Sequence, residues 1–301
     1  WRIRRKLELT SSRGRIKQNR LMNTLKALNL GSKFLKKNNI ETFNLDSELL
    51  LADVLKFSRE KLLINLNYKI KKKKFHKFKK SLFRRKNNEP IAYILKKKEF
   101  WKHTFFVNKN VLIPRPETEI IIEELLEEIG LETSKYLLDV GTGSGCIIIS
   151  ILKERSNCAG TAIDISQKAL NVAKYNAKIH QIQNKINFIN IDIDKHIYNK
   201  YDFVLSNPPY INKFELNRLD SNVKSYEPHL ALEAGVDGLN LIRKLILKSK
   251  VLLKKRGKLI FEIGEKQVNK SKDLLLRNGF YINKICKDIY LKPRVIISTK
   301  L

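Results

Sequence analysis

The sequence predicts an α/β fold: a mostly parallel sheet that ends in an antiparallel C-terminal hairpin, preceded by a small helical domain and a β-hairpin linker. Three observations lead to this prediction. The 301 residues suit two domains better than one. Before about residue 88 the apolar side chains recur at helical spacing. From about residue 136, continuous apolar runs alternate with amphipathic segments, as in a buried parallel sheet covered by helices on both faces.

The helical domain is expected over residues 22–89, where it would recognise a partner. Asp46 stands where it can cap a helix. The apolar residues that follow it fall at 3.6-residue spacing: Leu49, Leu50, Val54 and Leu55. Further on, Phe75, Phe78 and Leu82 predict a second helix with a narrow apolar stripe on one face and a field of Lys and Arg on the other.

The charge of the chain allows two interpretations. Lys and Arg number 61 against 30 Asp and Glu, a formal net charge of +31, which is typical of nucleic-acid binding. Lys, Asn and Ile are abundant along the whole chain, however, as the composition of an A/T-rich genome would also produce. Lys71–Lys86 is denser, with ten basic residues and no acid. That field is either a solvated helix face or a contact for an acidic partner, such as a ribosome or a factor that works on one.

Several classes of protein are excluded. The three cysteines, Cys146, Cys158 and Cys286, form no CxxC pair, so neither a zinc site nor a disulfide framework is indicated and a cytoplasmic location is expected. The longest apolar run is too short to span a membrane. Met22 is the only methionine, so we expect the native protein to begin there and the basic residues 1–21 to be an upstream extension.

The linker is expected over residues 90–116. Ile91–Leu95 and Phe105–Leu112 are β-branched and aromatic runs, which predict the two strands of a hairpin. Pro114 and Pro116 would stop the second strand.

The last domain is expected over residues 117–301. It opens with a helix from about Glu117 to Glu128. The strands expected after that helix are Tyr136–Val140, Gly160–Asp164, Ile186–Ile191, Tyr201–Ser206 and Lys258–Ile263. The helices expected between and after them are Gly145–Arg155, Ser166–His180, Gly238–Lys254 and Lys266–Arg277. Tyr281–Ile285 and Arg294–Ser298 predict the closing hairpin at the edge of the sheet.

A glycine-rich loop, LLDVGTGSGCII (137–148), follows the first of these strands. Glycines let the backbone turn tightly and lie against a ligand, at which the N–H groups of the next helix point. The spacing is GxGxG without a following GK[ST], which argues against a P-loop and weakens a nicotinamide reading. Asp164, at the end of the second strand, is placed for ribose hydroxyls, and Asp192 for an adenine amino group with Ile193 packed on the ring. Together they predict a nucleoside-bearing cofactor.

The fourth strand runs directly into Asn207-Pro208-Pro209-Tyr210. The Asn207 side-chain oxygen and the Pro208 carbonyl can each accept one hydrogen of a planar NH2 group and turn its nitrogen toward the methyl of S-adenosylmethionine. Preorganised dipoles there favour positive charge on the attacking nitrogen. Tyr210 offers a flat face for an amide or a base. The predicted chemistry is an in-line displacement at the sulfonium methyl, which needs no metal.

Taken together, these motifs are similar to those of the HemK/PrmC family, the release-factor glutamine methyltransferases. The resemblance runs from about Met22 to the C-terminus and includes LIPRPETE (112–119), the glycine loop, AIDIS, SNPPYI and YEPHLALEAGVDGL (226–239), in family order and spacing. It implies a cytosolic enzyme with a Rossmann-like methyltransferase domain that uses S-adenosylmethionine. The reaction it implies is methylation of the side-chain nitrogen (N5) of the glutamine in the GGQ motif of peptide-chain release factors, supporting translation termination.

The resemblance and the motifs together assign the site residues. We expect the cofactor to be bound by Asp139, Gly141, Thr142, Gly143, Ser144, Gly145, Asp164, Asp192, Ile193 and Asn207. We expect Asn207, Pro208, Pro209 and Tyr210 to bind the substrate, and Asn207, Pro208 and Tyr210 to be catalytic. The family often has an aromatic residue where this sequence has Ile193, so an aliphatic contact with adenine is expected instead. Glu117, Thr118 and Glu233 stand near the site by motif position only.

Two rival functions stay open. An adenine-N6 or cytosine-N4 nucleic-acid methyltransferase would use the same NPPY geometry, because its target is also a conjugated amino group, and the charge would hold phosphates. An inactive RNA- or ribosome-binding module would keep the fold without the chemistry. LIPRPETE and YEPHLALEAG favour the protein-glutamine enzyme. Its expected partner is a release factor; direct nucleic-acid binding is not required, no membrane is involved, and a monomer is expected.

Overall fold

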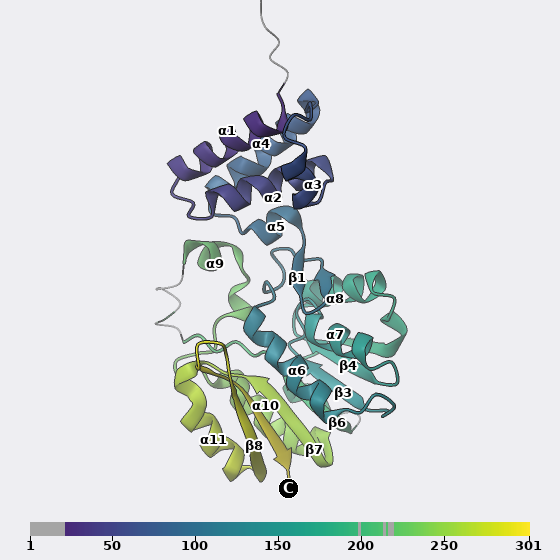
Figure 1. The fold of residues 1–301 in the computed structure, drawn as a ribbon. Helices are drawn as coiled ribbons and strands as arrows, with labels where there is room; N and C mark the ends of the chain where they lie inside the picture. The colour runs from purple at the N-terminus through teal and green to yellow at the C-terminus, as the bar shows by residue number, and fades with distance from the viewer. Residues whose placement is uncertain (1–21, 198–199, 213–214, 216–219) are drawn as a thin grey trace, which may run out of the picture. The chain divides into compact units, whose positions relative to one another are not determined.

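The computed structural model describes residues 22–197, 200–212, 215 and 220–301 (Figure 1). The extension expected before Met22 lies outside these residues. The chain divides into two compact units, one that ends at Lys86 and one that runs from Asn87 to Leu301. The domain limits expected at residues 89 and 116 stay predictions. Throughout the described ranges, no helix combines the length and the apolar character that crossing a membrane requires.

The described part of the first unit consists of helices α1 (Thr24–Lys37), α2 (Phe43–Leu55), α3 (Arg59–Ile64) and α4 (Lys72–Lys86). Gly31 lets α1 approach its neighbours, because a Cβ atom there would lie 2.3 Å from the Ser47 hydroxyl on α2 and 2.7 Å from the Phe78 ring on α4. The stripe predicted on α4 is confirmed: Phe78 and Leu82 are buried. The sequence therefore forms this helix around one narrow apolar face.

Asp46 does not cap a helix, and that prediction is wrong. Helix α2 begins three residues earlier, at Phe43, and carries Asp46 inward, where its side chain is buried. The Arg85 Nε of α4 lies 2.6 Å from Asp46 Oδ2, and the Thr42 hydroxyl donates to the same oxygen at 2.8 Å. A carboxylate can be buried when a cation and further donors replace its water, and Arg85 supplies that cation here.

The second unit begins with the linker, which contains a short hairpin at a different place from the one predicted. The strands are β1 (Lys98–Phe100) and β2 (His103–Phe105), paired antiparallel. Ile91–Leu95, expected as a strand, is helix α5. Of the run Phe105–Leu112, only Phe105 belongs to a strand. The expected strands are therefore wrong, although a β-hairpin is present in the linker.

A side chain on α8 (Gln167–Ile179) explains why the second run does not continue as a strand. The Asn176 amide accepts from the Phe106 N–H at 2.8 Å and donates to the Phe106 carbonyl at 3.0 Å. It thus takes the place of a neighbouring strand. The apolar side chains that follow, Val107, Val111 and Ile113, pack against Ala169 and Val172 of α8 without any ladder of hydrogen bonds.

The sheet of the second unit has, among the described residues, seven strands in the order β5-β4-β3-β6-β7-β9-β8. Their bounds are β3 (Tyr136–Val140), β4 (Ala159–Asp164), β5 (Ile186–Asn190), β6 (Tyr201–Ser206), β7 (Leu253–Glu262), β8 (Phe280–Lys287) and β9 (Pro293–Lys300). Strands β5, β4, β3, β6 and β7 pair parallel, and β9 pairs antiparallel with both β7 and β8. The expected mostly parallel sheet with a C-terminal edge hairpin is confirmed.

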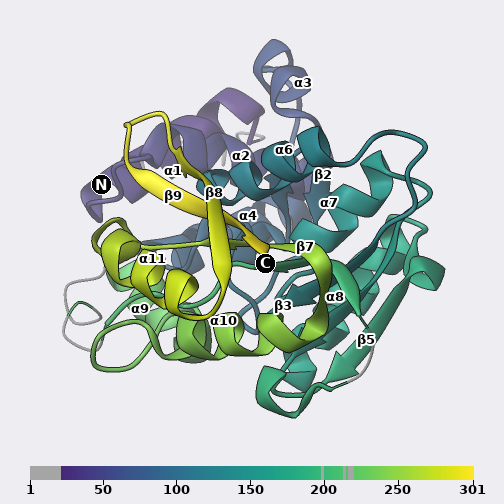
Figure 2. The ribbon, with the colours of Figure 1, turned by 90° about the horizontal axis from the view of Figure 1, so that it is seen from below.

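Helices cover both faces of the sheet, as Figure 2 shows for α6 and α7 on one side and α10 and α11 on the other. These helices are α6 (Glu119–Glu128), α7 (Cys146–Glu154), α10 (Asn240–Leu252) and α11 (Val268–Arg277). Neighbouring residues of one strand face opposite sides, so Leu137 packs with α6 and α7 while Leu138 packs with α10 and α11. The predicted helices of this domain are therefore present, and α6 is preceded by a 3-10 turn at Pro116–Thr118.

Replacing Arg85 by methionine tests the buried pair of the first unit. The change removes the cation that lies 2.6 Å from the buried Asp46 carboxylate, so the free energy of opening of α2 and α4 should fall by about 3–5 kcal/mol. Hydrogen exchange of the amides of these helices measures that energy. The matched control is Arg59→Met, which removes a half-exposed pair with Glu48 and should cost no more than about 1 kcal/mol. Equal losses in the two variants would contradict the assignment.

Candidate functional site

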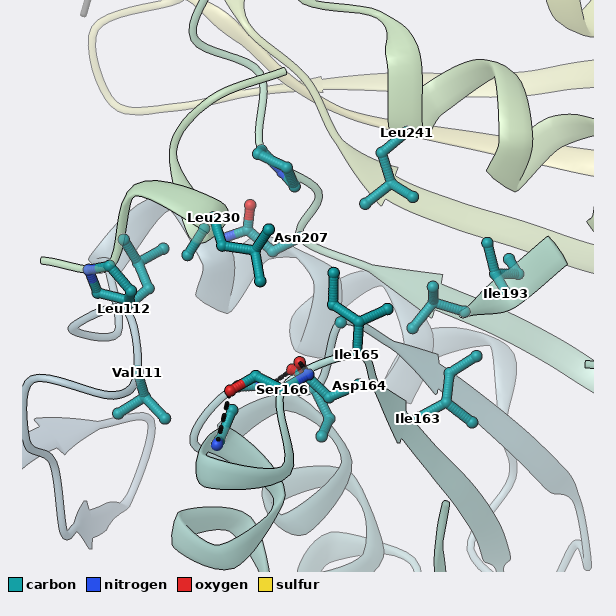
Figure 3. Close-up of a pocket in the computed structure, with 18 of the residues that line it drawn as sticks. Val111, Leu112, Ile163, Asp164, Ile165, Ser166, Ile193, Asn207, Leu230 and Leu241 are labelled. Carbon is teal, nitrogen blue, oxygen red and sulfur yellow. Dashed lines mark hydrogen bonds between the residues drawn. The ribbon is translucent and has the colours of Figure 1, made fainter. Parts of the chain in front are cut away.

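A cavity of about 400 Å³ opens at the carboxyl ends of the parallel strands, where the strand order reverses between β3 and β6. Ligands of open α/β sheets bind at such a point. Figure 3 shows Asp164, Ile193 and Asn207 on different sides of this cavity. Segments far apart in sequence contribute to its wall: Val111 and Leu112 from the linker, and Leu230 and Leu241 from the second half of the chain.

The glycine-rich loop forms one wall of the cavity. Gly141 and Gly143 have φ of 69° and 56°, a backbone conformation that L side chains rarely adopt. A Cβ atom on Gly141 would meet nothing within 4 Å, so the space beside the loop is open to a ligand. Cys146 and Ile147, the first residues of α7, line the same wall. The wall fits a ligand pressed flat against the backbone.

Asp164, at the end of β4, faces the cavity from its floor. Its two oxygens accept from the N–H of Gly143 at 3.0 Å and of Ser166 at 2.9 Å. Burial raises the pKa of this carboxyl, and those two backbone donors oppose the shift. Each carboxylate oxygen accepts more than one hydrogen bond, so lone pairs stay available for vicinal hydroxyls of a ribose.

At the adenine end expected from the sequence, the two residues behave differently. Ile193 lines the cavity with an apolar side chain that is almost wholly packed into the core, since only 2% of its surface is exposed. Asp192 begins the 3-10 turn Ile193–Lys195 and accepts from the Asp194 N–H. Lys244 of α10 lies 3.4 Å from Asp192 and 2.5 Å from Asp194. Lys244 also lines the cavity, and no motif of the sequence indicated it.

Asp139 lies beneath the glycine loop, and it is not among the residues that line the cavity. It is wholly buried, it accepts from the Thr142 hydroxyl at 2.7 Å, and its Oδ1 has no hydrogen-bond partner within the described part of the chain. Burial raises the pKa of Asp139 to about 7, against the Thr142 hydrogen bond. The bond from Thr142 to Asp139 holds the loop from below. Gly145 likewise packs inward, against Ile149 and Ala173.

The NPPY segment follows β6 on the opposite side of the loop. Asn207 and Pro209 line the cavity, whereas Pro208 and Tyr210 do not. Asn207 Nδ2 donates to the Thr118 hydroxyl at 2.8 Å, and that hydroxyl donates to Glu262 Oε2 at 2.6 Å. Since the Asn207 amide nitrogen is bonded to Thr118, its oxygen Oδ1 is the end of the amide that is available to a ligand. Thr118 belongs to LIPRPETE, so the two motifs meet at this bond.

Glu262, at the end of β7, is 1% exposed, and the Tyr210 side chain near its carboxyl favours the charged form. Burial raises the pKa of Glu262 to about 7, opposed by Thr118, Arg294 and Tyr210. Burial and the Glu262 charge together raise the pKa of Tyr210, so its hydroxyl stays protonated. The Tyr210 carbonyl is held in turn by the Gln267 amide at 3.0 Å. Nothing in the sequence pattern marked Glu262, because a glutamate at the end of a strand is ordinarily expected to be exposed, whereas this one is buried.

Two further buried side chains tie the site together and were also missed. Asn176, besides holding Phe106, donates to the Ser144 carbonyl at 2.8 Å and so joins the linker to the glycine loop. Glu227 accepts from the Ile113 N–H at 3.1 Å and from Arg115 at 2.6 Å, joining YEPHLALEAG to LIPRPETE. In the sequence, a polar residue in a helix or a loop is ordinarily expected to be exposed. Asn176 and Glu227 can be buried because their hydrogen-bond partners lie more than 30 residues away along the chain.

Comparisons with known proteins agree with this architecture. The family model described as PrmC N-terminal domain matches residues 26–95, and the one described as Methyltransferase small domain matches residues 116–221. The chain is 38% identical over 269 residues to the release factor glutamine methyltransferase of Clostridium acetobutylicum, covering 88% of this chain and 94% of that protein. It is 37% identical over 281 residues to the enzyme of the same name from Fusobacterium nucleatum, covering 92% and 78%.

Among solved structures, the catalytic domain of hMettl16 in complex with a 3'UTR hairpin is similar in fold. The two share 20% sequence identity with a TM-score of 0.53, over 65% of this chain and 74% of that one. At that identity the likeness concerns the fold alone.

Asp164→Asn tests the expected cofactor site. The variant keeps the shape of the side chain and removes the charge that would accept from ribose, so the Kd for S-adenosylmethionine should rise by about 10- to 100-fold. Isothermal titration calorimetry of the two proteins measures the difference. Asp273→Asn, an exposed carboxyl of α11 that does not line the cavity, is the control and should bind as the wild type does. An unchanged Kd in Asp164→Asn would exclude Asp164 from the cofactor site.

Proposed function

The chain belongs to the release factor glutamine methyltransferase family, and from that premise we propose that it transfers a methyl group from S-adenosylmethionine to the side-chain amide nitrogen of a release-factor glutamine. The glutamine is the one in the GGQ motif, and the reaction supports translation termination. The observation that carries the proposal is Asn207, which stands at the wall of the cavity with its amide nitrogen engaged and its oxygen available.

The residues that would hold the cofactor surround one cavity. The loop Gly141–Gly145 would lie against its amino-acid part, Asp164 would accept from the ribose, and Ile193 would pack on the adenine. Asp192 would accept from the adenine amino group, although Lys244 competes for its carboxylate. When bound, S-adenosylmethionine supplies a methyl on a positively charged sulfur, which a neutral nitrogen can accept. The chain itself has only to bind, orient and exclude water.

The substrate amide would be held by acceptors. An NH2 group of a side-chain amide carries two N–H donors, which match the Asn207 Oδ1 and the Pro208 carbonyl. The two acceptors fix the nitrogen in one orientation and stabilise the positive charge that grows on it. Tyr210, whose ring follows in the same segment, would cover one face of the amide. The amide nitrogen becomes strongly acidic as it is methylated, so its proton leaves without a dedicated base.

The partner of this reaction would be a folded release factor rather than a free peptide. A glutamine in an exposed loop carries little specificity, so a second contact is expected. In helix α4, Lys73, Lys77 and Lys80 are exposed and lie on one face, opposite the buried Phe78 and Leu82. We infer that this basic face of α4 attracts an acidic surface of the release factor, and that the enzyme acts in the cytoplasm as a monomer.

Labelling tests the function. The protein is incubated with methyl-labelled S-adenosylmethionine and either a release factor that contains GGQ or unmethylated DNA, and the label is located by mass spectrometry. Label is expected on the GGQ glutamine, with a loss of about 100-fold or more in Asn207→Ala because one of the two acceptors is gone. Asn283→Ala, on the exposed face of β8, is the control and should label normally. Label on adenine alone would overturn the proposal in favour of a nucleic-acid methyltransferase.

Charge reversal tests the basic face of α4. Replacing Lys73, Lys77 and Lys80 by glutamate should lower kcat/KM for the release factor roughly ten-fold at low ionic strength, with little effect at high salt, because steering by charge is screened. The same change at Lys250, Lys255 and Lys287, which are exposed in the second unit, alters the net charge equally and is the control. If both triple variants lose the same activity, only the total charge matters and the face has no specific role.

A further inference from the structure

The hydrogen bonds behind Asn207 run in one direction. Asn207 Nδ2 donates to Thr118 Oγ1 at 2.8 Å, and Thr118 Oγ1 donates to Glu262 Oε2 at 2.6 Å. Thr118 and Glu262 are 2% and 1% exposed, so water does not compete for these atoms. Tyr210, at the other end of the NPPY segment, favours the charged form of the same carboxyl. Glu262 thus anchors the first residue of that segment through Thr118.

We propose that Glu262, acting through Thr118, sets which end of the Asn207 amide faces the substrate. This inference rests on the proposed function and adds to it two positioning residues, neither of which touches the reacting atoms. A hydroxyl has a single proton. Because the Thr118 proton is given to the acceptor-only carboxylate of Glu262, Thr118 can only accept from Asn207. Asn207 must therefore turn Nδ2 toward Thr118 and Oδ1 toward the cavity.

The orientation matters because the two ends of an asparagine amide have nearly the same shape and opposite hydrogen-bonding roles. A substrate NH2 group offers only donors, so it needs the Asn207 oxygen. With the amide reversed, an NH2 group would meet another NH2 group and leave both donors without an acceptor, which is costly for buried groups. Nothing else in the described contacts of Asn207 distinguishes the two orientations. The relay from Glu262 to Thr118 does so.

The ionisation of Glu262 controls the relay. Burial raises the pKa of Glu262 to about 7; the groups that face it are Thr118 and Glu117 from the turn before α6, Tyr210 after β6, and Arg294 from β9. Thr118, Tyr210 and Arg294 favour the charged form, and Glu117 disfavours it. Above that pKa the carboxylate accepts, and the relay is set for catalysis. Below it the acid can donate to Thr118, whose own proton then points at Asn207 and favours the reversed amide.

Two variants of Thr118 separate positioning from folding. Thr118→Val keeps the shape and removes the hydroxyl, so kcat at pH 8 should fall by about 10- to 100-fold. Thr118→Ser restores the hydroxyl and should recover activity to within about three-fold of the wild type. Melting temperatures monitor the fold of both. Equal activity in the valine and serine variants, with the same pH profile, would overturn the proposal.

Glu262→Gln tests the titration, because glutamine keeps the shape and has no ionisable proton. In the wild type, kcat/KM should fall about ten-fold for each pH unit below the pKa of Glu262, and in Glu262→Gln this dependence should vanish. A variant that keeps the wild-type acid limb would show that another group is responsible and would overturn the proposal. A loss of activity caused only by a damaged fold would lower the rate at every pH without removing the limb.

A measurement without catalysis distinguishes this inference from the proposed function. The side-chain NH2 resonances of Asn207, identified by their loss in Asn207→Ala, should titrate with Glu262 in the 15N-labelled free protein and stop titrating in Glu262→Gln. Titration in a protein that fails to label the GGQ glutamine would leave the relay standing and refute the proposed function. Labelling of that glutamine without any such titration would refute the relay and leave the function.

Discussion

The parallel pairing of β3 with β4 on one side and β6 on the other is the constraint on which the site depends. In the register of the sheet, Val140 lies opposite both Ile163 and Ser206, so the three strands end at the same level. The residues that come next in the three segments are therefore brought to one edge: Gly141 after β3, Asp164 at the last position of β4, and Asn207 after β6. Because the strand order reverses here, the helices that follow leave to opposite faces and the cavity opens between them.

Two buried carboxyl groups support this edge from beneath, and each is paired with a threonine. Asp139 holds Thr142 under the glycine loop, and Glu262 holds Thr118 under the NPPY segment. Burying a carboxyl in an apolar sheet is costly, which is why the pKa of both rises to about 7. That cost is offset in part by the hydroxyls of Thr142 and Thr118, which donate hydrogen bonds to the two carboxyl groups. As a result, the polar atoms of the glycine loop and of the NPPY segment are already oriented before a ligand binds.

In the linker, side chains from distant parts of the sequence satisfy backbone groups that a paired strand was expected to satisfy. The Asn176 amide satisfies both backbone groups of Phe106 and also the carbonyl of Ser144. The Glu227 carboxylate accepts from the Ile113 N–H while it pairs with Arg115. Local β propensity in Phe105–Leu112 was overridden for this reason, since a buried strand needs a partner strand and a side-chain amide can replace one only locally.

The sequence by itself determined the alternation of strands and helices, the edge hairpin, the glycine loop, Asp164 and the NPPY segment, because these depend on periodicity and on residues adjacent in the chain. It did not determine the capping residue of α2, the path of the linker, or the roles of Asn176, Thr118, Glu227 and Glu262. The roles of these four side chains depend on hydrogen-bond partners that lie between 32 and 144 residues away along the chain. A polar residue in a sequence is expected at the surface, and only the tertiary structure supplies the donor or acceptor that lets it be buried.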